Sequence, residues 1–460
     1  MFRKLLIANR GEIACRVARA ARSLGIRTVA VYSDPDEKSL HVEACDEAVR
    51  LGPGPARESY LDAAKVLAAA KKTGAEAIHP GYGFLSEQAD FAEACTGGGI
   101  VFVGPPPGAL RALKDKAQAR EVMRAASVPV VPGSEGHVSS ESEALAEAQV
   151  VGFPVLVKAA AGGGGIGMQV ANDDAELVKA LRACRDRARS SFGKDAVYLE
   201  RYFPAPRHVE VQVLGDGRLT LHLGARECSI QRRHQKIVEE APATAFVLPR
   251  RPELEERLLA AGLAAARAVG YANAGTCEFL LAGDEFYFIE LNARLQVEHP
   301  VTEAVTGLDL VQLQIRIAAG EHLPFGQSDV KRMGHAIECR INAEDPVKFF
   351  PSPGKIVRFD PPVPADGKFH EGVRVDAGYR AGDTVTPFYD SLLAKLVVHA
   401  TTRDAAIARL RSALDGFTVE GVKTNLPLHR RIAASESFAR GELSTRFLES
   451  LPPETPRRPA

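Results

Sequence analysis

The sequence lacks the features that mark several large classes of protein. None of its apolar runs approaches the ~20 residues needed to cross a bilayer, and no signal-peptide pattern precedes the strand-like residues 5–8. The seven cysteines are scattered and form no C-x-x-C pair, which is typical of reduced thiols in a cytosol. The 58 basic residues balance the 58 acidic ones, which argues against a large basic surface for nucleic acid. We therefore expect a soluble, cytoplasmic protein with no nucleic-acid or membrane partner.

The length of 460 residues is too great for a single core and predicts two to four domains of roughly 100–200 residues each. Residues 5–8 and 27–32 are strand-like and flank a helical pattern over 12–24. This order predicts a βαβ unit in a parallel sheet, and so an α/β multidomain protein. Further along the chain we expect single helices over residues 109–126 and 302–319.

A run of glycines at 162–167, interrupted only by Ile166, follows a strand that ends at Lys158. Glycines let several backbone N–H groups point at one anion, because no Cβ intervenes. The run is not a P-loop, since no Gly-Lys-Ser/Thr follows it, and the alternative is a flexible linker. A dinucleotide-binding turn at residues 9–12 is disfavoured, because it holds one glycine where that fingerprint needs three. We predict that the glycine run binds nucleotide phosphate.

The segment 276–292 has the pattern of a hairpin, with strands over 277–281 and 286–291. A three-residue turn at 283–285 would pair Glu278 with Glu290, whose Cβ atoms would then lie about 4.5–5.5 Å apart. Two carboxylates that close repel each other unless a cation lies between them, and an oxygen-only site beside phosphate suits Mg²⁺. The alternative is a pair of solvated glutamates on an exposed face.

Polar and aliphatic residues alternate beyond this hairpin, which predicts one extended strand over residues 290–300. The polar side chains on its one face are Glu290, Asn292, Arg294, Gln296 and Glu298. Such a row suits a small oxyanion beside a metal, with Arg294 to bind it and Glu298 to move a proton. A basic cluster at 231–236 is interpreted as anion handling in a cleft rather than as a nucleic-acid patch, because the chain is neutral.

Several of these segments resemble the ATP-grasp fold and, more narrowly, biotin carboxylase. The residues that carry the resemblance extend from about 5 to 447 and are Lys158 with the glycine run, 79–83, 200–201, 206–210, 231–240, 290–302, 334–346 and 351–354. The resemblance implies a Rossmann-like N-terminal domain over 1–115 and an ATP-grasp domain over 116–330. It also implies a mobile glycine-rich lid over about 130–204. A C-terminal mixed β/α domain over 331–447 and a disordered tail over 448–460 complete the expected organisation.

The resemblance also implies roles for individual residues. ATP contacts are implied for Lys116, Lys158, Gly164, Gly165, Glu200, Arg201, Phe203, His208, Gln231, His234, Glu278, Leu280 and Glu290. Ligands of Mg²⁺ or Mn²⁺ are implied to be Glu278, Glu290 and Asn292. Bicarbonate contacts are implied for Lys236, Arg294, Gln296, Val297 and Arg340. Tyr82 and Arg340 would contact biotin, and the catalytic residues would be Arg294, Glu298, Arg340 and Lys236.

The implied reaction is the ATP-dependent carboxylation of biotin N1′ through carboxyphosphate. The chain has no Met-Lys-Met acceptor, so biotin would come on a separate biotin carboxyl carrier protein. A carboxyltransferase would then pass the carboxyl group to an acyl-CoA, in the first place acetyl-CoA; propionyl-CoA and pyruvate are the alternative acceptors. The family also implies a homodimer. Two other hypotheses are an ATP-grasp ligase that activates another carboxylate, and a catalytically dead regulatory protein.

Position 166 departs from the family pattern, because Ile166 stands where the family usually has a basic residue. Without that cation the closed lid should hold the phosphates less tightly. We expect Ile166→Arg to lower the apparent KM for ATP while kcat stays the same. Steady-state kinetics at varied ATP concentration would check this, and an unchanged KM would contradict the role given to the lid.

Overall fold

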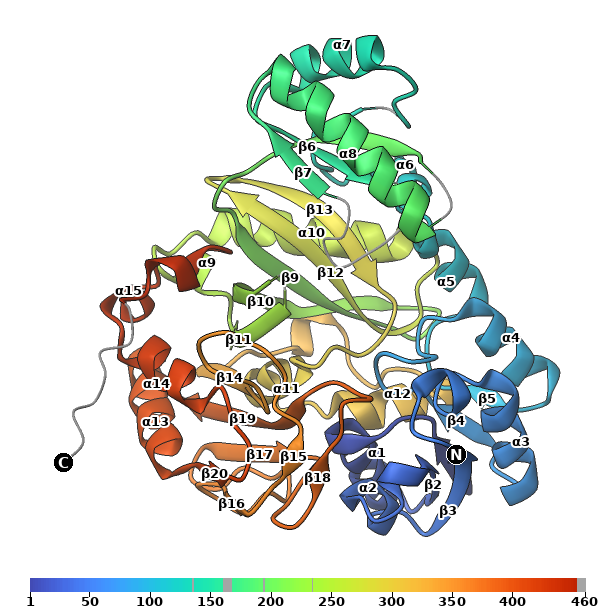
Figure 1. Ribbon diagram of the computed structural model, residues 1–460. Helices are drawn as coiled ribbons and strands as arrows, with labels where there is room; N and C mark the ends of the chain where they lie inside the picture. Colours follow the sequence, from blue (N-terminus) through green and yellow to red (C-terminus); the bar gives the residue numbers. More distant parts are fainter. Residues whose placement is uncertain (135, 160–167, 193–194, 234, 453–460) are drawn as a thin grey trace.

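The computed structural model describes residues 1–134, 136–159, 168–192, 195–233 and 235–452. Residues 1–125 form a parallel five-stranded sheet with the order β3-β2-β1-β4-β5, together with its surrounding helices (Figure 1). The expected βαβ unit is confirmed by β1 (Lys4–Ile7), α1 (Gly11–Ser23) and β2 (Arg27–Ser33). The other elements are α2 (Leu40–Glu43), β3 (Glu47–Gly52), α3 (Ala63–Thr73), β4 (Ala77–His79), α4 (Ala89–Gly97), β5 (Val101–Phe102), α5 (Pro107–Lys114) and α6 (Lys116–Ala125).

The strand order places two loops side by side at one edge of this sheet. β1 and β4 are adjacent and parallel, so the loops after their carboxyl ends meet there, as ligand-binding loops do in open α/β sheets. Asn9, after β1, donates from Nδ2 to the carbonyl oxygens of Pro80 and Tyr82, after β4, at 2.7 and 2.8 Å. Gly81 has φ of 63°, and a Cβ there would lie 2.9 Å from Asn9 Nδ2, so a side chain would break this contact.

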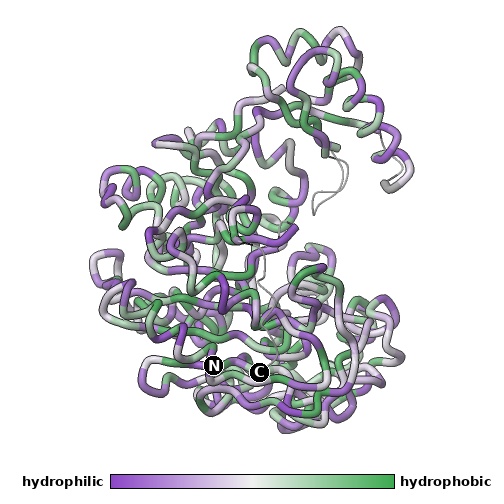
Figure 2. Tube along the Cα trace, turned by 60° about the vertical axis from the view of Figure 1, so that its left-hand side comes forward, coloured by the Kyte–Doolittle hydropathy of each residue, from purple (hydrophilic) through white to green (hydrophobic). Residues whose placement is uncertain are grey.

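A small unit projects from the rest of the molecule in both views (Figures 1 and 2). Its three strands have the order β7-β6-β8, and they pack against two helices around a core of their own. The glycine run of the sequence lies between two of these strands and outside the described residues. The elements are α7 (Glu141–Val151), β6 (Val155–Ala159), β7 (Met168–Ala171), α8 (Asp174–Phe192) and β8 (Val197–Arg201).

An antiparallel sheet of eight strands, β13-β12-β9-β10-β11-β14-β19-β17, forms the centre of the molecule. It joins strands from both sides of position 330, so residues 331–447 share a sheet with the preceding segment. Its strands are β9 (Arg207–Gly215), β10 (Thr220–Arg232), β11 (Gln235–Ala241), β12 (Asn273–Ala282), β13 (Glu285–Asn292), β14 (His335–Asn342), β17 (Val373–Ala377) and β19 (Leu392–Ala400). The helices that follow or precede them are α9 (Thr244–Val247), α10 (Pro252–Ala268), α11 (His299–Thr306), α12 (Leu310–Ala318), α13 (Arg403–Gly416), α14 (Leu426–Ala434) and α15 (Glu436–Ala439).

Short strands complete the C-terminal part, and its last element corrects the expected tail. These strands are β15 (Gly354–Lys355), β16 (Arg358–Asp360), β18 (Thr384–Val385) and β20 (Thr418–Glu420). The prediction of disorder from residue 448 is wrong at its start, because Phe447–Ser450 form the 3₁₀ helix η4 and Leu451 is buried. Residues 453–460 lie outside the described part of the chain.

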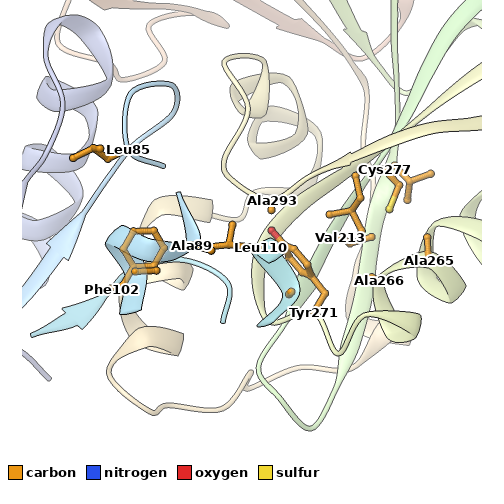
Figure 3. Close-up of a cluster of buried hydrophobic side chains, with 14 of the residues drawn as sticks. Leu85, Ala89, Phe102, Leu110, Val213, Ala265, Ala266, Tyr271, Cys277 and Ala293 are labelled. Carbon is orange, nitrogen blue, oxygen red and sulfur yellow. The ribbon is translucent and has the colours of Figure 1, made fainter. Parts of the chain in front are cut away.

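One hydrophobic core crosses from the N-terminal sheet to the central sheet. Figure 3 shows Leu85, Phe102 and Leu110 on one side, with Tyr271 and Cys277 on the other. Continuous burial of this kind fixes the two sheets against each other, because separating them would expose apolar surface. The loops after β1 and β4 therefore keep a defined position relative to the central sheet.

Two helices predicted as single are each divided in two. Residues 109–126 are broken at Asp115, which has an extended conformation between α5 and α6. Residues 302–319 are broken at Gly307, which has φ of 72° and ends α11 in the left-handed conformation. Asp309 then accepts a hydrogen bond from the backbone N–H of Gln312 and begins α12. Among the described residues, none of the helices is long and apolar enough to cross a membrane.

Candidate active site

A cavity of about 1740 Å³ lies where the N-terminal loops, the projecting unit and the central sheet meet. It brings together residues that are far apart in the sequence. The predicted site residues that line it are Tyr82, Lys158, Glu200, Arg201, Phe203, His208, Gln231, Lys236, Glu278, Leu280, Glu290, Asn292, Arg294, Gln296, Val297 and Arg340. Gly164, Gly165, Ile166 and His234, with the side chain of Lys116, lie outside the described part of the chain.

The hairpin that carries Glu278 and Glu290 has the predicted pairing but a different turn. Ala282 pairs with Glu285, so the turn has two residues, Gly283 and Asp284, rather than three. A register shift between Glu278 and Phe279 then compensates for the shorter turn. This β-bulge adds one residue to β13, which restores the pairing of Glu278 with Glu290.

The predicted strand over residues 290–300 ends early. β13 stops at Asn292, and α11 begins at His299. The polar row therefore does not form one strand face, because the chain turns between these elements. Glu290, Asn292, Arg294 and Gln296 line the cavity, whereas Glu298 is not among its lining residues. Glu298 is fully buried and forms ion pairs with Lys236 and Arg340.

Lys236 is the centre of a buried network of charges. Its Nζ lies 2.5 Å from Glu210, 2.6 Å from Glu278 and 2.8 Å from Glu298. Burial alone would lower the pKa of Lys236, but these carboxylates outweigh it and raise the pKa well above its usual value. Lys236 is therefore a permanent cation at the base of the cavity.

The same network keeps two of its carboxylates ionised. Burial alone would raise the pKa of Glu278, but Lys236 and His208 lower it by more. Burial likewise opposes ionisation of Glu298, yet Lys236 and Arg340 bring its pKa well below the usual value. At neutral pH both side chains are negative, so Glu298 is available as a proton acceptor once its ion pairs loosen.

Arg340 is the second cation bound to Glu298. Its Nε donates to Glu239 at 2.6 Å and its Nη2 donates to Glu298 at 2.9 Å. β14 carries Arg340 beside β11, which carries Lys236, so adjacent strands place two cations at the cavity base. Burial raises the pKa of Glu239, although Arg340 opposes this shift. Glu239 thus fixes the orientation of a guanidinium that lines the cavity.

Arg294 is held in place from three sides. Its Nε donates to Glu87 at 3.0 Å, its Nη2 to Asn292 at 3.0 Å and its Nη1 to Gln296 at 3.2 Å. Gln296 in turn donates to Glu278 at 2.9 Å. Arg294, Lys236 and Arg340 thus give one cavity three cations, an arrangement that suits a small oxyanion.

The projecting unit contributes a second group of charges. Lys158 and Arg120 both form ion pairs with Glu200, which links β6 and β8 to α6. Phe203 stacks on Tyr287 with ring centroids 5.2 Å apart, and Arg201 lies 5.7 Å from the Phe203 ring. Leu280 and Phe203 both supply apolar surface to the cavity. A flat apolar group and an attached polyanion would fit this part of the cavity.

Glu278, Glu290 and Asn292 are suited to a divalent cation. They lie on paired strands, line the same cavity and offer only oxygen ligands, which Mg²⁺ prefers. Glu278 and Glu290 are directly paired across these strands, so two carboxylates lie side by side, and the amide oxygen of Asn292 accepts a hydrogen bond from Arg294. A second grouping of ligand atoms, from His208, Glu210 and Glu278, lies within 4.8 Å on the same sheet.

Sequence reasoning missed several residues that hold the site together. Arg120 and Glu87 come from distant segments, and nothing in their local sequence marks them. Glu210 lies opposite Arg226 on one neighbouring strand and opposite Glu278 on the other, because β9 lies between β10 and β12. The alternation of His208, Glu210 and Gln212 along β9 was the available signal for a polar face.

The most deeply buried part of the network is Arg226, whose side chain has 0% exposure. It donates to Glu210 at 2.5 Å, and also to Gln212, Thr302 and Thr276. Removing one member of a buried ion pair leaves an uncompensated charge. We therefore expect Arg226→Met to lower the free energy of unfolding by about 3–5 kcal/mol.

Urea denaturation would measure this loss. An exposed pair provides the control, since Arg358→Met removes an ion pair with Asp360 on the surface and should cost about 0–1 kcal/mol. Equal losses in the two variants would contradict the importance assigned to the buried network.

Comparisons with known proteins agree with this fold and site. Family models match the chain as the biotin carboxylase N-terminal domain over residues 1–110 and as the ATP-binding domain of the carbamoyl-phosphate synthase L chain over 115–325. A third matches as the biotin carboxylase C-terminal domain over 338–450. The ATP-binding match and the cavity together define an ATP-dependent ligase with an ATP-grasp fold.

Relatives match the chain over nearly its whole length. The biotin carboxylase of Pseudomonas aeruginosa is 50% identical, with 98% of both chains covered, and a pyruvate carboxylase subunit of Methanothermobacter thermautotrophicus is 48% identical, with 98% and 90% covered. The structure of the Campylobacter jejuni biotin carboxylase–β,γ-ATP complex superposes with a TM-score of 0.92 at 42% identity, covering 98% and 99% of the two chains. The chain belongs to the biotin carboxylase family.

Proposed function

We propose that this protein carboxylates N1′ of biotin, using ATP and bicarbonate, with biotin carried on a separate protein. The observation that carries the proposal is that Lys236 and Arg340, which both pair with the buried carboxylate of Glu298, line one cavity together with Arg294. Three cations can bind a small oxyanion, and a carboxylate among them can take its proton. A related structure, the biotin carboxylase domain dimer of the 2-oxoglutarate carboxylase of Hydrogenobacter thermophilus, was solved with MgADP, ADP and bicarbonate. It is 47% identical, has a TM-score of 0.90 and covers 98% and 97% of the two chains.

In the proposed reaction bicarbonate binds to Lys236, Arg294, Gln296, Val297 and Arg340. Bicarbonate competes with Glu298 for Lys236 and Arg340, which together with Arg226 lower the pKa of Glu298. Each contact that Glu298 gives up raises its pKa and makes it a better base. Glu298 then accepts the bicarbonate proton as a bicarbonate oxygen attacks the γ-phosphorus of ATP, and ADP leaves.

The carboxyphosphate formed in this way breaks down to CO₂ and phosphate. The phosphate takes the N1′ proton of biotin, and the resulting N1′ attacks CO₂. Arg340 stabilises the negative charge that develops on the ureido oxygen, and Tyr82 flanks the ring. Such stabilisation acts where charge appears, so it lowers the barrier rather than only improving binding.

ATP is proposed to lie between the projecting unit and the central sheet. Lys158, Glu200, Arg201, Phe203, His208, Gln231 and Leu280 would contact it, together with Lys116, Gly164, Gly165 and His234. Glu278, Glu290 and Asn292 would hold Mg²⁺ or Mn²⁺, which neutralises phosphate charge when bound. Closure of the residues around 130–204 would keep water from the labile intermediate.

The proposed partners are a biotin carboxyl carrier protein and a carboxyltransferase, with acetyl-CoA as the final acceptor. Pyruvate is the second candidate, supported by the 48% identity to a pyruvate carboxylase subunit. The homodimer is proposed from the family, one of whose members is described as a domain dimer. The division into domains at 115, 330 and 447 likewise stays a prediction.

The test is a bicarbonate-dependent ATPase assay with and without free biotin. Stimulation of ADP release by biotin, together with incorporation of ¹⁴C from bicarbonate into biotin, is the expected result. Turnover that is indifferent to biotin would overturn the proposal and favour another ATP-grasp carboxylate ligase. Absence of any turnover with intact ATP binding would favour a regulatory protein.

A further inference from the structure

The mouth of the cavity has an apolar and basic rim that the proposed reaction does not use. It is formed by two loops, residues 343–353 between β14 and β15 and residues 386–391 between β18 and β19. Val347 and Phe350 on the first loop are 58% and 60% exposed, and Phe388 on the second is 48% exposed. Isolated exposed apolar side chains are common, but three around one opening form a patch, and such patches mark interaction sites.

The first loop is held rigidly in this exposed conformation. Asp345 accepts hydrogen bonds from the backbone N–H groups of Val347 and Lys348 at 3.0 and 2.8 Å, and from Lys423 at 2.8 Å. The backbone N–H groups of Asp345 and Phe349 also bond across the loop, each at 2.9 Å. The backbone hydrogen bond from Lys348 has the largest effect on Asp345, and together with the contacts from Lys423 and Val347 it lowers the pKa of Asp345 well below its usual value. A preorganised loop loses little conformational entropy when a partner binds.

The aromatic side chains on the rim are also fixed in place. Arg233 lies 5.8 Å from the centroid of the Phe350 ring, and Arg232 lies 5.5 Å from that of Phe349. Phe388 packs against Gly54, where an added Cβ would lie 2.6 Å from the ring. Fixed aromatic and arginine side chains of this kind are enriched at the centres of protein interfaces.

The charges of the rim favour a partner with an acidic edge. Arg233 and Lys348 are exposed at the mouth, while Asp345 is neutralised by Lys423. Within the two rim loops, residues 343–353 and 386–391, Asp390 is the exposed acidic residue. The excess of positive charge would attract carboxylates on an incoming surface and speed its association.

We infer that this rim, formed by Val347, Lys348, Phe350 and Phe388, is the docking surface for the body of the biotinylated carrier domain. The inference rests on the proposed function. A biotin tethered to a protein can reach Arg340 only if the body of that protein stays at the cavity mouth, and the rim is continuous with the cavity that holds Arg340. The carrier would present apolar side chains to Val347 and Phe350, with carboxylates toward Lys348.

The experiment compares two substrates, free biotin and a purified biotinylated carrier domain of the acetyl-CoA carboxylase type. The double variant Val347→Ser/Phe350→Ser should raise the KM for the carrier about tenfold, since truncating interface anchors costs more than 1 kcal/mol. Its kinetics with free biotin should stay at the wild-type level. Val357→Ser is the matched control, because Val357 is 68% exposed but lies outside the cavity lining, between β15 and β16.

A charge variant tests the electrostatic part separately. Lys348→Glu should lower kcat/KM for the carrier at low salt and weaken its salt dependence, with free biotin again unaffected. The measurement is kcat/KM for each substrate over a series of NaCl concentrations. A salt dependence equal to that of the wild type would contradict the acidic edge assigned to the carrier.

The outcomes separate the docking surface from the proposed function. If the wild-type enzyme responds to free biotin but its KM for the biotinylated carrier is no lower than its KM for free biotin, the docking inference alone is overturned. The docking inference is also overturned if the rim variants and Val357→Ser have the same KM for the carrier. A change in molecular mass of Val347→Ser/Phe350→Ser in light scattering would overturn it too, because the rim would then be a contact between two copies of this chain. Failure of the wild type to respond to free biotin would overturn the proposed function instead.

Discussion

Replacing Glu298 by glutamine should lower kcat for biotin-dependent ATP cleavage by about 10²–10⁴-fold, the usual contribution of a general base. Glutamine keeps the shape of the side chain but cannot accept the bicarbonate proton. The KM for ATP should change little, because Glu298 pairs with Lys236 and Arg340, whereas Lys158 and Glu200, which are proposed to bind ATP, pair with each other on the projecting unit. Steady-state kinetics and calorimetric titration of ATP would measure the two quantities.

Loss of folding is a competing explanation for an inactive Glu298→Gln, and the network argues against it. Lys236 keeps Glu210 and Glu278 as partners at 2.5 and 2.6 Å, so the substitution leaves no isolated cation. Glu227→Gln is the matched control, since Glu227 is also a buried glutamate but pairs with Arg207 instead of Lys236 and Arg340. Similar losses of kcat in both variants, or full activity of Glu298→Gln, would contradict the role of Glu298 as the base.

The pairing of Glu278 with Glu290 could be predicted from the sequence, although the three-residue turn from which it was predicted has only two residues. Alternation and a turn signal were enough to find the hairpin, because both are local. The turn is one residue shorter than predicted, and the bulge between Glu278 and Phe279 restores that residue. A bulge depends on how the strand packs against its neighbours, so the local sequence does not reveal it. The predicted register was therefore correct at Glu278 and Glu290, and it was wrong by one residue in the part of the hairpin between them and the turn.

The polar row from Glu290 to Glu298 shows where a local pattern stops being informative. Alternation predicts an extended segment, but Gln296 and Glu298 reach their partners because the chain turns before α11. Those partners, Glu278, Lys236 and Arg340, lie on three other strands. The residues of the site could thus be identified, whereas their order in space could not, since it depends on pairing between strands that are distant in the chain.

Residues that only support the site were given no role from the sequence. Glu87 fixes Arg294 from the N-terminal unit, and Glu239 fixes Arg340 from the neighbouring strand. Each is an ordinary glutamate in its own segment. Its importance comes from the long-range contact, which the parallel sheet and the eight-stranded sheet create together.

Replacing Arg340 should have the second large effect, and it separates charge from geometry. Removing one donor that stabilises a developing oxyanion costs about 10²–10³-fold in kcat, so we expect Arg340→Gln to lower biotin carboxylation by that factor. Arg340→Lys keeps the charge but cannot bond Glu239 and Glu298 through a planar fork, so it should recover only part of the loss. Incorporation of ¹⁴C from bicarbonate into biotin would measure the rate of each variant.

The pH profile of carboxylation distinguishes the two Arg340 variants. Arg340 lowers the pKa of both Glu298 and Glu239, so its removal raises both pKa values. Because the carboxylate form of Glu298 is the active one, the acid limb of the rate profile should move to higher pH in Arg340→Gln and much less in Arg340→Lys. An acid limb that stays in place in both variants would show that Arg340 does not act on Glu298, whatever the loss in rate.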